Sequence, residues 1–280
     1  HFEFSSEYCT TLPDSIGELT NLTMLSLWVK NIVRLPDSIG NLSNLTTLRL
    51  DSNRFTAVPD WIGNFTHLSK LDLRWNRLTD LPGSIGNLSS IERLRLTGNK
   101  FVVLPLSIGT LTSLTQLYLD SNRLTDIPEF IGSLSNLTAL SLRFNRIMNL
   151  PTSFGNLTSL IELNLNQNKL TMLPESIGNL TNLRELSLNS SDLTNLPTSF
   201  GNLTSLITLD LRGNQLTMLP ESIGNLTNLT ILFLDGNGLS SLPDSIRNLT
   251  NLETLDLEQT LIPKSEIVRI QALLPNCEFY

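Results

Sequence analysis

Aromatic and basic side chains recur together in the first half of the sequence, where they could supply recognition chemistry. Arg74-Trp75 and Arg143-Phe144 are adjacent pairs, and Tyr118 lies between them along the chain. Tryptophan, tyrosine and arginine are enriched among the residues that dominate binding energy at protein interfaces. These residues therefore indicate binding rather than catalysis.

Residues that could perform acid–base, nucleophilic or metal chemistry are scarce. The only histidines are His1 and His67. His1 is at the terminus, and His67 lies beside the start of a repeat and away from the strand face, so we expect neither a Ser–His–Asp arrangement nor a multi-histidine metal centre. Gly236-Asn237-Gly238 is not followed by the helix pattern of a phosphate-binding loop. We expect no enzyme activity, no catalytic residues, no metal site and no cofactor.

Composition favours a soluble globular protein. The 280 residues are 40% hydrophobic and carry a formal net charge of −7. No apolar run approaches the ~18 residues of a membrane-spanning helix, so we expect no membrane insertion. The acidic balance disfavours a nucleic-acid partner, since nucleic-acid binding usually needs a basic surface. The sequence begins at His1 without a leader pattern, so we expect that a signal peptide was removed or was never present.

The elements that position these side chains follow from an internal repeat. Eleven prolines recur every 23 residues from Pro13 to Pro243, and ten glycines keep the same spacing from Gly17 to Gly224, with Arg247 in the eleventh place. The consensus of the repeat is LxxLxLxxNxLTxLPxSIGNLTN. A period of this length is the signature of a solenoid, in which each repeat packs on its neighbours.

Each part of the consensus predicts a local structure. The leucines of LxL point to one face of a short strand and leave their neighbours on the other face. The Asn that follows lies where the chain turns, and its amide can bond to backbone groups. The LPxSIG segment predicts a single helical turn with Pro at its first position and Gly at its end. Stacked repeats then give an α/β solenoid with a parallel sheet on the concave face and short helical turns on the convex face.

We expect a single domain over residues 1–280. It comprises an N-terminal half-repeat or cap (1–21), the repeats (22–257) and a C-terminal cap (258–280). The C-terminal cap has an apolar stripe at Ile267, Ile270, Leu273 and Leu274, which predicts an amphipathic helix. A short strand is expected around residues 277–279.

The two cysteines lie near opposite ends of the chain. Cys9 and Cys277 would be separated by a stack roughly 50 Å long, which is far beyond disulfide reach. We expect each to act as a small buried residue in a cap.

The repeat LxxLxLxxNxLTxLPxSIGNLTN resembles those of leptospiral surface leucine-rich repeat proteins, and also those of Ras-binding and Scribble-type scaffolds of animals and plants. The ending IQALLPNCEFY is similar to the C-terminal cap of the leptospiral group. The resemblance covers roughly residues 12–280. It implies a leucine-rich repeat horseshoe, a right-handed solenoid, and it provides no catalytic residues.

One internal duplication shows where side-chain identity has changed. Residues 151–183 and 197–229 are identical at 28 of 33 positions, and all five differences fall within residues 162–169 of the first copy. Those positions lie on the strand face opposite the leucines or beside it. This face is therefore predicted to be a binding surface.

Tryptophan, tyrosine, phenylalanine and charged residues concentrate on one half of that face. The candidate partner-binding residues are Trp28, Arg49, Lys70, Asp72, Arg74, Trp75, Arg93, Arg95, Tyr118, Arg143 and Phe144. An alternative applies to the charges, because Arg49–Asp72–Arg95 and Asp51–Arg74 alternate in sign across neighbouring strands. Such ladders can neutralise themselves, at ~0.2–1 kcal/mol for each pair.

A cationic rim follows the Asn position in six consecutive repeats. Its members are Arg54, Arg77, Lys100, Arg123, Arg146 and Lys169. Charge is also uneven along the chain: residues 22–159 hold 13 basic and 9 acidic residues, and residues 160–280 hold 6 and 13. The rim has two interpretations, a functional surface or a solvated feature of a copied consensus.

The sequence as a whole predicts a monomeric, non-enzymatic scaffold that binds a protein partner of unknown identity. The resemblance implies a bacterial secreted or cell-surface protein that contacts a host protein. One alternative is a cytoplasmic signalling scaffold of the Ras-group type. Another is carbohydrate or nucleic-acid recognition through the aromatic residues and the rim, for which strong salt dependence would be expected.

Overall fold

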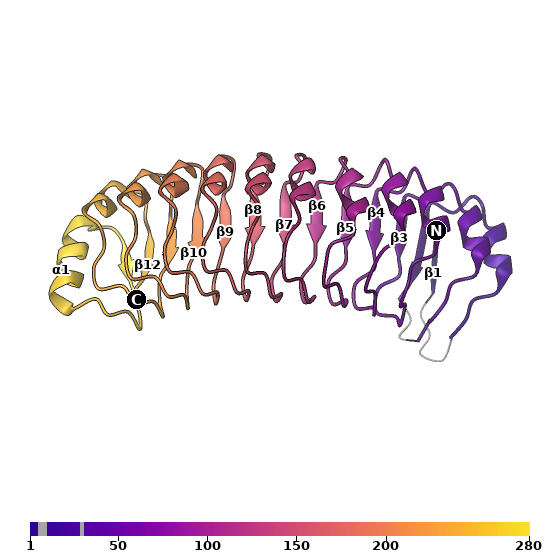
Figure 1. The fold of residues 1–280 in the computed structure, drawn as a ribbon, viewed down its shortest axis with the longest axis horizontal. Helices are drawn as coiled ribbons and strands as arrows, with labels where there is room; N and C mark the ends of the chain where they lie inside the picture. The colour runs from indigo at the N-terminus through magenta and orange to yellow at the C-terminus, as the bar shows by residue number, and fades with distance from the viewer. Residues whose placement is uncertain (5–9, 29–30) are drawn as a thin grey trace. The chain divides into compact units, whose positions relative to one another are not determined.

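The computed structural model describes residues 1–4, 10–28 and 31–280, so Cys9 lies outside the described residues. The strands are short and parallel, and each of the first eleven described strands is followed by a 3-10 helix (Figure 1). The strands are β1 (Phe2–Phe4), β2 (Met24–Leu27), β3 (Thr47–Arg49), β4 (Lys70–Asp72), β5 (Arg93–Arg95), β6 (Gln116–Tyr118), β7 (Ala139–Ser141), β8 (Glu162–Asn164), β9 (Glu185–Ser187), β10 (Thr208–Asp210), β11 (Ile231–Phe233), β12 (Thr254–Asp256) and β13 (Glu278–Phe279).

The helices are short except for the last. The 3-10 helices are η1 (Asp14–Glu18), η2 (Asp37–Asn41), η3 (Asp60–Asn64), η4 (Gly83–Asn87), η5 (Leu106–Thr110), η6 (Glu129–Ser133), η7 (Thr152–Asn156), η8 (Glu175–Asn179), η9 (Thr198–Asn202), η10 (Glu221–Asn225) and η11 (Asp244–Asn248). One α-helix, α1 (Lys264–Leu273), follows them. The predicted α/β class, with parallel strands and short helical turns, is confirmed.

The chain divides into two compact units, which are described separately. The first unit comprises residues 1–124 and 133–137, and the second comprises residues 125–132 and 138–280. The expectation of one domain over residues 1–280 stays a prediction.

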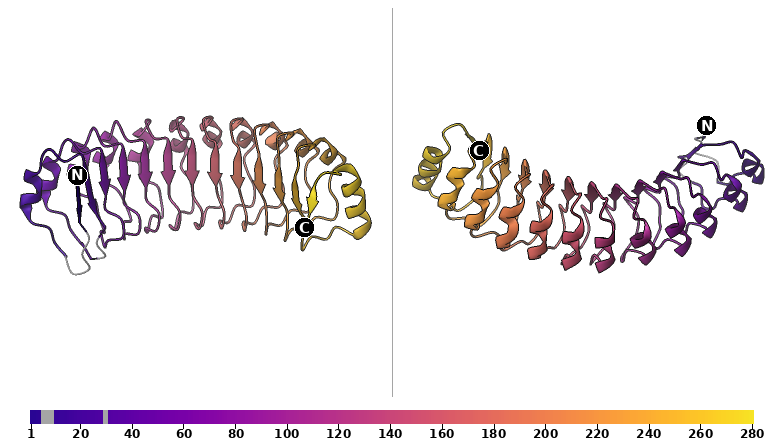
Figure 2. Two further views of the ribbon diagram at one scale, coloured as in Figure 1. Left: turned by 180° about the vertical axis from the view of Figure 1, so that it is seen from behind. Right: turned by 90° about the horizontal axis from the view of Figure 1, so that it is seen from above.

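In the first unit, β1 to β5 each pair in parallel with the next strand, and β6 pairs with β5. The register advances by one repeat, so Leu71 lies opposite Leu48 on one side and Leu94 on the other. All three leucines are 0% exposed. The strands lie along one face and the 3-10 helices along the opposite face (Figure 2). The strand face that the helices do not cover is called the open face below.

The second unit repeats this arrangement from β7 to β13. Neighbouring strands are again parallel, with Leu209 opposite both Leu186 and Leu232. Its leucines are equally buried, and Leu165 is 0% exposed. The predicted alternation of leucine and non-leucine faces is therefore present in both units.

The Asn of the consensus forms a buried hydrogen-bonded ladder. Asn76 Nδ2 donates to the carbonyl oxygens of Leu50 (2.9 Å) and Leu73 (3.1 Å), and its Oδ1 accepts from the Phe55 amide (3.0 Å). One side chain thus satisfies backbone groups in its own repeat and in the one before. The predicted role of this Asn is confirmed. Ser191 occupies the position in one repeat, and its buried hydroxyl has no hydrogen-bond partner among the described residues.

The helical turn differs in detail from the expectation. Pro59 has extended backbone angles (φ −67°, ψ 156°) and precedes η3, so it is not the first helical residue. Gly63 lies inside η3 and does not end it. It is required for packing, because a methyl group there would lie 2.6 Å from the Ser84 carbonyl oxygen and 2.8 Å from Ser84 Cβ in the next turn.

The C-terminal cap explains why Arg247 replaces the repeated glycine. On the side facing the C-terminus, η11 packs against α1 and not against a further 3-10 helix, so no following turn approaches residue 247 as Ser245 approaches Gly224. Arg247 instead forms an exposed ion pair with Asp244 (3.4 Å), and Arg269 of α1 reaches the same carboxylate at 2.7 Å.

The predicted closing helix and last strand are both present. Ile270 and Leu274 are buried, and Ile267 and Leu273 are half-buried. Cys277 is partly buried just before β13, and burial followed by the nearby Glu278 carboxylate raises the pKa of its thiol to about 11. This cysteine is therefore a poor nucleophile near neutral pH.

Candidate functional site

The open face of the first unit carries nine of the candidate residues. On β4, buried Leu71 alternates with Lys70 and Asp72, so these two side chains point away from the leucine core. The other candidates occupy matching positions on neighbouring strands or directly after them: Trp28, Arg49, Arg74, Trp75, Arg93, Arg95 and Tyr118. The remaining two, Arg143 and Phe144, belong to the second unit.

Trp75 combines exposure with an unfavourable backbone conformation. Its side chain is 55% exposed and its φ is 54°, in the left-handed region. Every repeat has a positive φ at this position where the structure describes it, and the other residues there are Ser52, Gly98, Ser121, Phe144, Gln167, Ser190, Gly213, Gly236 and Gln259. A bulky residue in this region is a steric outlier, costing roughly 1–2 kcal/mol.

The Trp75 ring packs against Gly98 of the next repeat. Gly98 occupies the same position in that repeat, with φ 73°, and a methyl group there would come within 2.7 Å of the Trp75 ring atoms Cδ2 and Cζ3. The ring therefore rests against backbone rather than against a side chain. Glycine serves two purposes here, because it accepts the left-handed conformation and leaves space for the indole.

Asp72 and Arg74 form a partly buried ion pair along one strand. Arg74 Nε donates to both oxygens of Asp72 (2.9 and 3.0 Å), and a terminal nitrogen lies 2.8 Å from Oδ2. The Asp72 side chain is 6% exposed, so burial without this partner would be costly. The hydrogen bonds to Asp72 raise the pKa of Arg74.

The predicted charge ladder across the strands is present only in part. Arg95 reaches Asp72 across the sheet at 3.6 Å, which is longer than the contact to Arg74 on the same chain segment. Among the described residues, Arg49 forms no ion pair with Asp72, and Asp51 forms none with Arg74. The closest neutralisation is therefore along the strand and not across it.

Arg93, Arg95, Gln116 and Tyr118 form a linked group on β5 and β6. The Arg95 guanidinium lies over the Tyr118 ring, 5.6 Å from its centroid, in the geometry of a cation–π contact. The Tyr118 hydroxyl donates to Gln116 Oε1 at 3.3 Å, and Arg93 Nε donates to the same oxygen. These contacts order the aromatic ring before any partner arrives.

In the second unit, Arg143 and Phe144 are in contact with each other. The Arg143 guanidinium lies 4.6 Å from the centroid of the Phe144 ring. Phe144 is 46% exposed and has φ 55°. The second bulky aromatic residue at this position is therefore also exposed at the expense of backbone strain.

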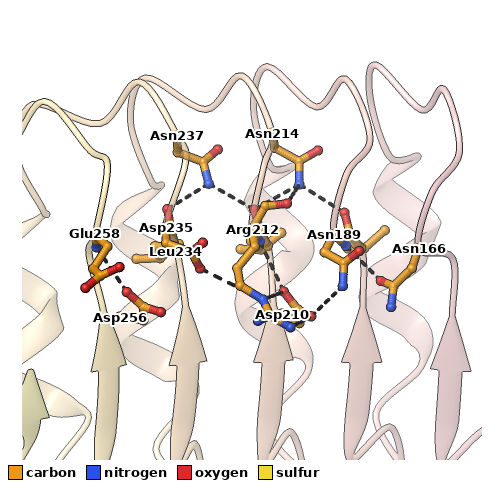
Figure 3. Close-up of polar contacts among 12 residues, drawn as sticks. Asn166, Asn189, Asp210, Arg212, Asn214, Leu234, Asp235, Asn237, Asp256 and Glu258 are labelled. Carbon is orange, nitrogen blue, oxygen red and sulfur yellow. Dashed lines mark hydrogen bonds and ion pairs between the residues drawn. The ribbon is translucent and has the colours of Figure 1, made fainter. Parts of the chain in front are cut away.

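A polar network on β9 to β11 was not among the candidate residues (Figure 3). Asp210 accepts hydrogen bonds from Arg212 Nε (2.9 Å), a terminal nitrogen of Arg212 (2.8 Å) and Asn189 Nδ2 (2.8 Å). Arg212 also lies 4.7 Å from the centroid of Phe233. The signal in the sequence is the tripeptide Asp-Leu-Arg, which occurs at 72–74 and again at 210–212 in the same repeat positions.

The network sets opposite pKa shifts on two neighbouring carboxylates. Burial alone would raise the pKa of Asp210, but the hydrogen bonds from Arg212 and Asn189 outweigh it, and the pKa lies below the ordinary value. Burial raises the pKa of Asp235, and the nearby Asp256 carboxylate raises it further. Arg212, 3.9 Å from Asp235, lowers this pKa without cancelling the rise.

The cationic rim is exposed in both units. Its side chains form no hydrogen bond or ion pair with any residue that the structure describes: Arg54, Arg77, Lys100, Arg123, Arg146 and Lys169. With no partner among the described residues, these six cations face solvent.

Among the described residues, no three or more His, Cys, Asp or Glu side chains are grouped so that they could hold a metal ion. Within 1–4, 10–28 and 31–280, no helix combines the length and the apolar character needed to cross a bilayer. His67 is exposed, and its Nδ1 lies 3.5 Å from the Thr66 hydroxyl.

Comparison with known proteins places these features in a family. A family model described as "Leucine-rich repeat region" matches residues 1–75, 117–193 and 175–273, and one described as "Leucine Rich Repeat" matches residues 67–88. A leucine-rich repeat protein of Leptospira interrogans is 36% identical, with a TM-score of 0.74, over 97% of this chain and 81% of that protein. No match is found among curated protein sequences.

Two further solved structures are similar over most of this chain. An internalin (inlF) of Listeria monocytogenes is 27% identical, with a TM-score of 0.69, over 94% of this chain and 81% of the internalin. The plant peptide hormone receptor RGFR1, solved in complex with RGF2, is 30% identical, with a TM-score of 0.68, over 96% of this chain and 53% of the receptor.

Proposed function

The chain belongs to the leucine-rich repeat family, whose members generally serve as protein-binding scaffolds, and on that premise we propose that its open face binds a protein partner without catalysing a reaction. The binding residues of the first unit are the aromatic and basic candidates around Trp75. Arg143 and Phe144 provide a corresponding pair in the second unit.

The conformation of Trp75 carries this proposal. A left-handed tryptophan costs stability, and three other repeats have glycine at the same position, where no such cost arises. The indole is nonetheless exposed and held flat against Gly98. Strain retained at an exposed aromatic residue is a feature of functional sites, and a preordered aromatic ring binds without losing side-chain entropy.

The proposed setting is the surface or the secreted fraction of a bacterium, with a host protein as partner and the chain acting as a monomer. Similarity to the Leptospira protein and to the Listeria internalin supports it. A secretion signal encoded upstream of the codon for His1 would support this setting further. A cytoplasmic gene product would support the alternative, an intracellular signalling scaffold.

A binding screen with paired variants tests the function. The chain is applied to an array of purified ectodomains and secreted host proteins, and each interaction is measured by biolayer interferometry. The variant Trp28→Ala/Trp75→Ala should weaken a specific interaction by about tenfold or more. Arg74 is left unchanged, because it neutralises buried Asp72.

The matched control is Leu106→Ala, which removes an apolar side chain that is 76% exposed outside the strands. It should leave the same interaction unchanged. The proposal fails if every specific partner tolerates the double tryptophan change, or if the Leu106 change weakens binding equally.

A further inference from the structure

A depression of about 310 Å³ lies on the open face of the first unit, over β2 to β5. Four cationic side chains line it, together with one acidic residue: Arg49, Lys70, Arg93, Arg95 and Asp72. Met24 is partly exposed and provides apolar surface in the same depression, whereas the side chains of Leu48 and Leu71 are buried in the core beneath it. The depression therefore combines a strong excess of positive charge with one partly exposed apolar side chain, Met24.

The one acidic residue in the depression is already engaged. Asp72 bonds to Arg74, and Arg95 lies 3.6 Å from it. The side chains of Arg49 and Lys70 form no hydrogen bond or ion pair with any residue in the described part of the chain. These two cations are therefore available to a ligand.

Arg93 is also only partly engaged. Its Nε donates to Gln116, which leaves both terminal nitrogens without a hydrogen bond inside the described ranges. A guanidinium held by Nε in this way presents its other donors in a fixed direction.

The register of the sheet places like charges opposite each other. Lys70 and Arg93 are direct partners on adjacent parallel strands. Like charges in this relationship destabilise a sheet. A bound anion between them would remove that repulsion, so the arrangement favours the occupied state.

We propose that this depression binds the carboxylates of an acidic segment on the protein partner, an inference that rests on the proposed function. Arginine forms bidentate hydrogen bonds with carboxylates, and Met24 can contact the aliphatic part of a Glu side chain. A long polyanion fits less well, because the chain has a net charge of −7 and Asp51 follows β3 beside the depression. The ligand is a compact acidic stretch of peptide.

The probe for this site is a short fluorescent oligo-glutamate peptide, titrated with the full chain at low salt and followed by anisotropy. The variant Arg49→Gln/Lys70→Gln/Arg93→Gln should weaken binding by roughly tenfold or more, because it removes three partly exposed ion pairs with the peptide. The control Arg54→Gln/Arg77→Gln/Arg123→Gln removes the same charge from the rim and should change affinity by less than about twofold. Circular dichroism verifies that both variants fold.

Each alternative result overturns the inference. Equal losses in the two triple variants would show that the peptide senses net charge only. Tighter binding of a sulfated oligosaccharide, with the same dependence on the three cations, would assign the depression to carbohydrate. A host partner that needs Trp75 but tolerates the first triple variant would leave the proposed function intact and remove only this site.

Discussion

The indole ring of Trp75 lies against the backbone of Gly98 in the next repeat. A methyl group on Gly98 would come within 2.7 Å of two ring carbons. Both residues have positive φ, 54° and 73°. The position of the exposed ring therefore depends on the absence of a side chain one repeat further along.

The change Gly98→Ala should displace the Trp75 ring and destabilise the fold. Gly213→Ala is a matched control, since Gly213 has φ 61° at the same repeat position, and a methyl group there would meet only ordinary contacts with Ser190 at 3.6 Å or more. Both changes should cost ~1–2 kcal/mol from backbone strain, and only Gly98→Ala should add the steric term. Urea unfolding measures the difference, and tryptophan fluorescence reports ring movement. Identical costs and unchanged fluorescence would contradict the contact.

Ser191→Asn should stabilise the second unit. The new amide would restore the ladder that Asn168 and Asn214 form on either side, in which Nδ2 donates to two leucine carbonyls and Oδ1 accepts from a backbone amide. Satisfying buried backbone groups is worth about 1–3 kcal/mol. Chemical denaturation measures the gain. Asn168→Ser is the reverse change and should lower the free energy of unfolding by a similar amount. If Ser191→Asn also lowers it, the amide does not join the ladder at residue 191.

Asp210→Asn should lower stability near neutral pH by about 1–3 kcal/mol, since it removes charge-assisted hydrogen bonds. The pKa of Asp210 is lowered in the folded state, so its contribution is present above the ordinary Asp pKa and is lost as pH falls through the folded value. The difference between wild type and variant should therefore shrink in acid. Urea titrations at several pH values measure it.

Asp235→Asn is the control of opposite sign. Burial, then Asp256, raise the pKa of Asp235, so its favourable contribution is present below the ordinary Asp pKa and is lost as pH rises through the folded value. The variant should be slightly more stable than wild type near neutral pH. A loss comparable to that of Asp210→Asn would show that the two carboxylates do not differ as described.

Leu165→Ala should cost ~2–5 kcal/mol, because this leucine is 0% exposed within the stacked core of the second unit. Leu106→Ala makes the same chemical change at an exposed position and should stay within about 0.5 kcal/mol of wild type. Equilibrium denaturation compares the two variants. Similar small effects would mean that the buried column is packed loosely enough to close the cavity.

The sequence was sufficient to predict the strands and the leucine core. The spacing of Leu71 and Leu73 identifies a strand face, and the fixed period predicts that Leu48, Leu71 and Leu94 stack. The amide role of Asn76 also followed from its type and place in the turn. The leucines recur throughout and the Asn recurs in most copies, so the examples reinforce one another.

Other features could not be predicted, because they depend on contacts between repeats. The role of Gly63 was assigned to ending a helix, whereas the glycine is required by the approach of Ser84. The left-handed backbone of Trp75 was missed, although Gly98 at the equivalent position is a signal for it. The pair formed by Asp210 and Arg212 was also missed, since only coordinates distinguish a bond along a strand from one across the sheet.

The contacts between glycine and serine in neighbouring turns have an evolutionary consequence. Gly178 faces Ser199, and Gly201 faces Ser222, so each repeat carries both halves of the contact, one for the repeat before it and one for the repeat after it. Recombination that copies a whole repeat therefore inserts a unit that fits at both junctions, whereas replacing the glycine alone damages one junction. A gene with such repeats tolerates the gain of whole repeats by unequal crossing-over more readily than it tolerates substitution of the glycines in its 3-10 turns.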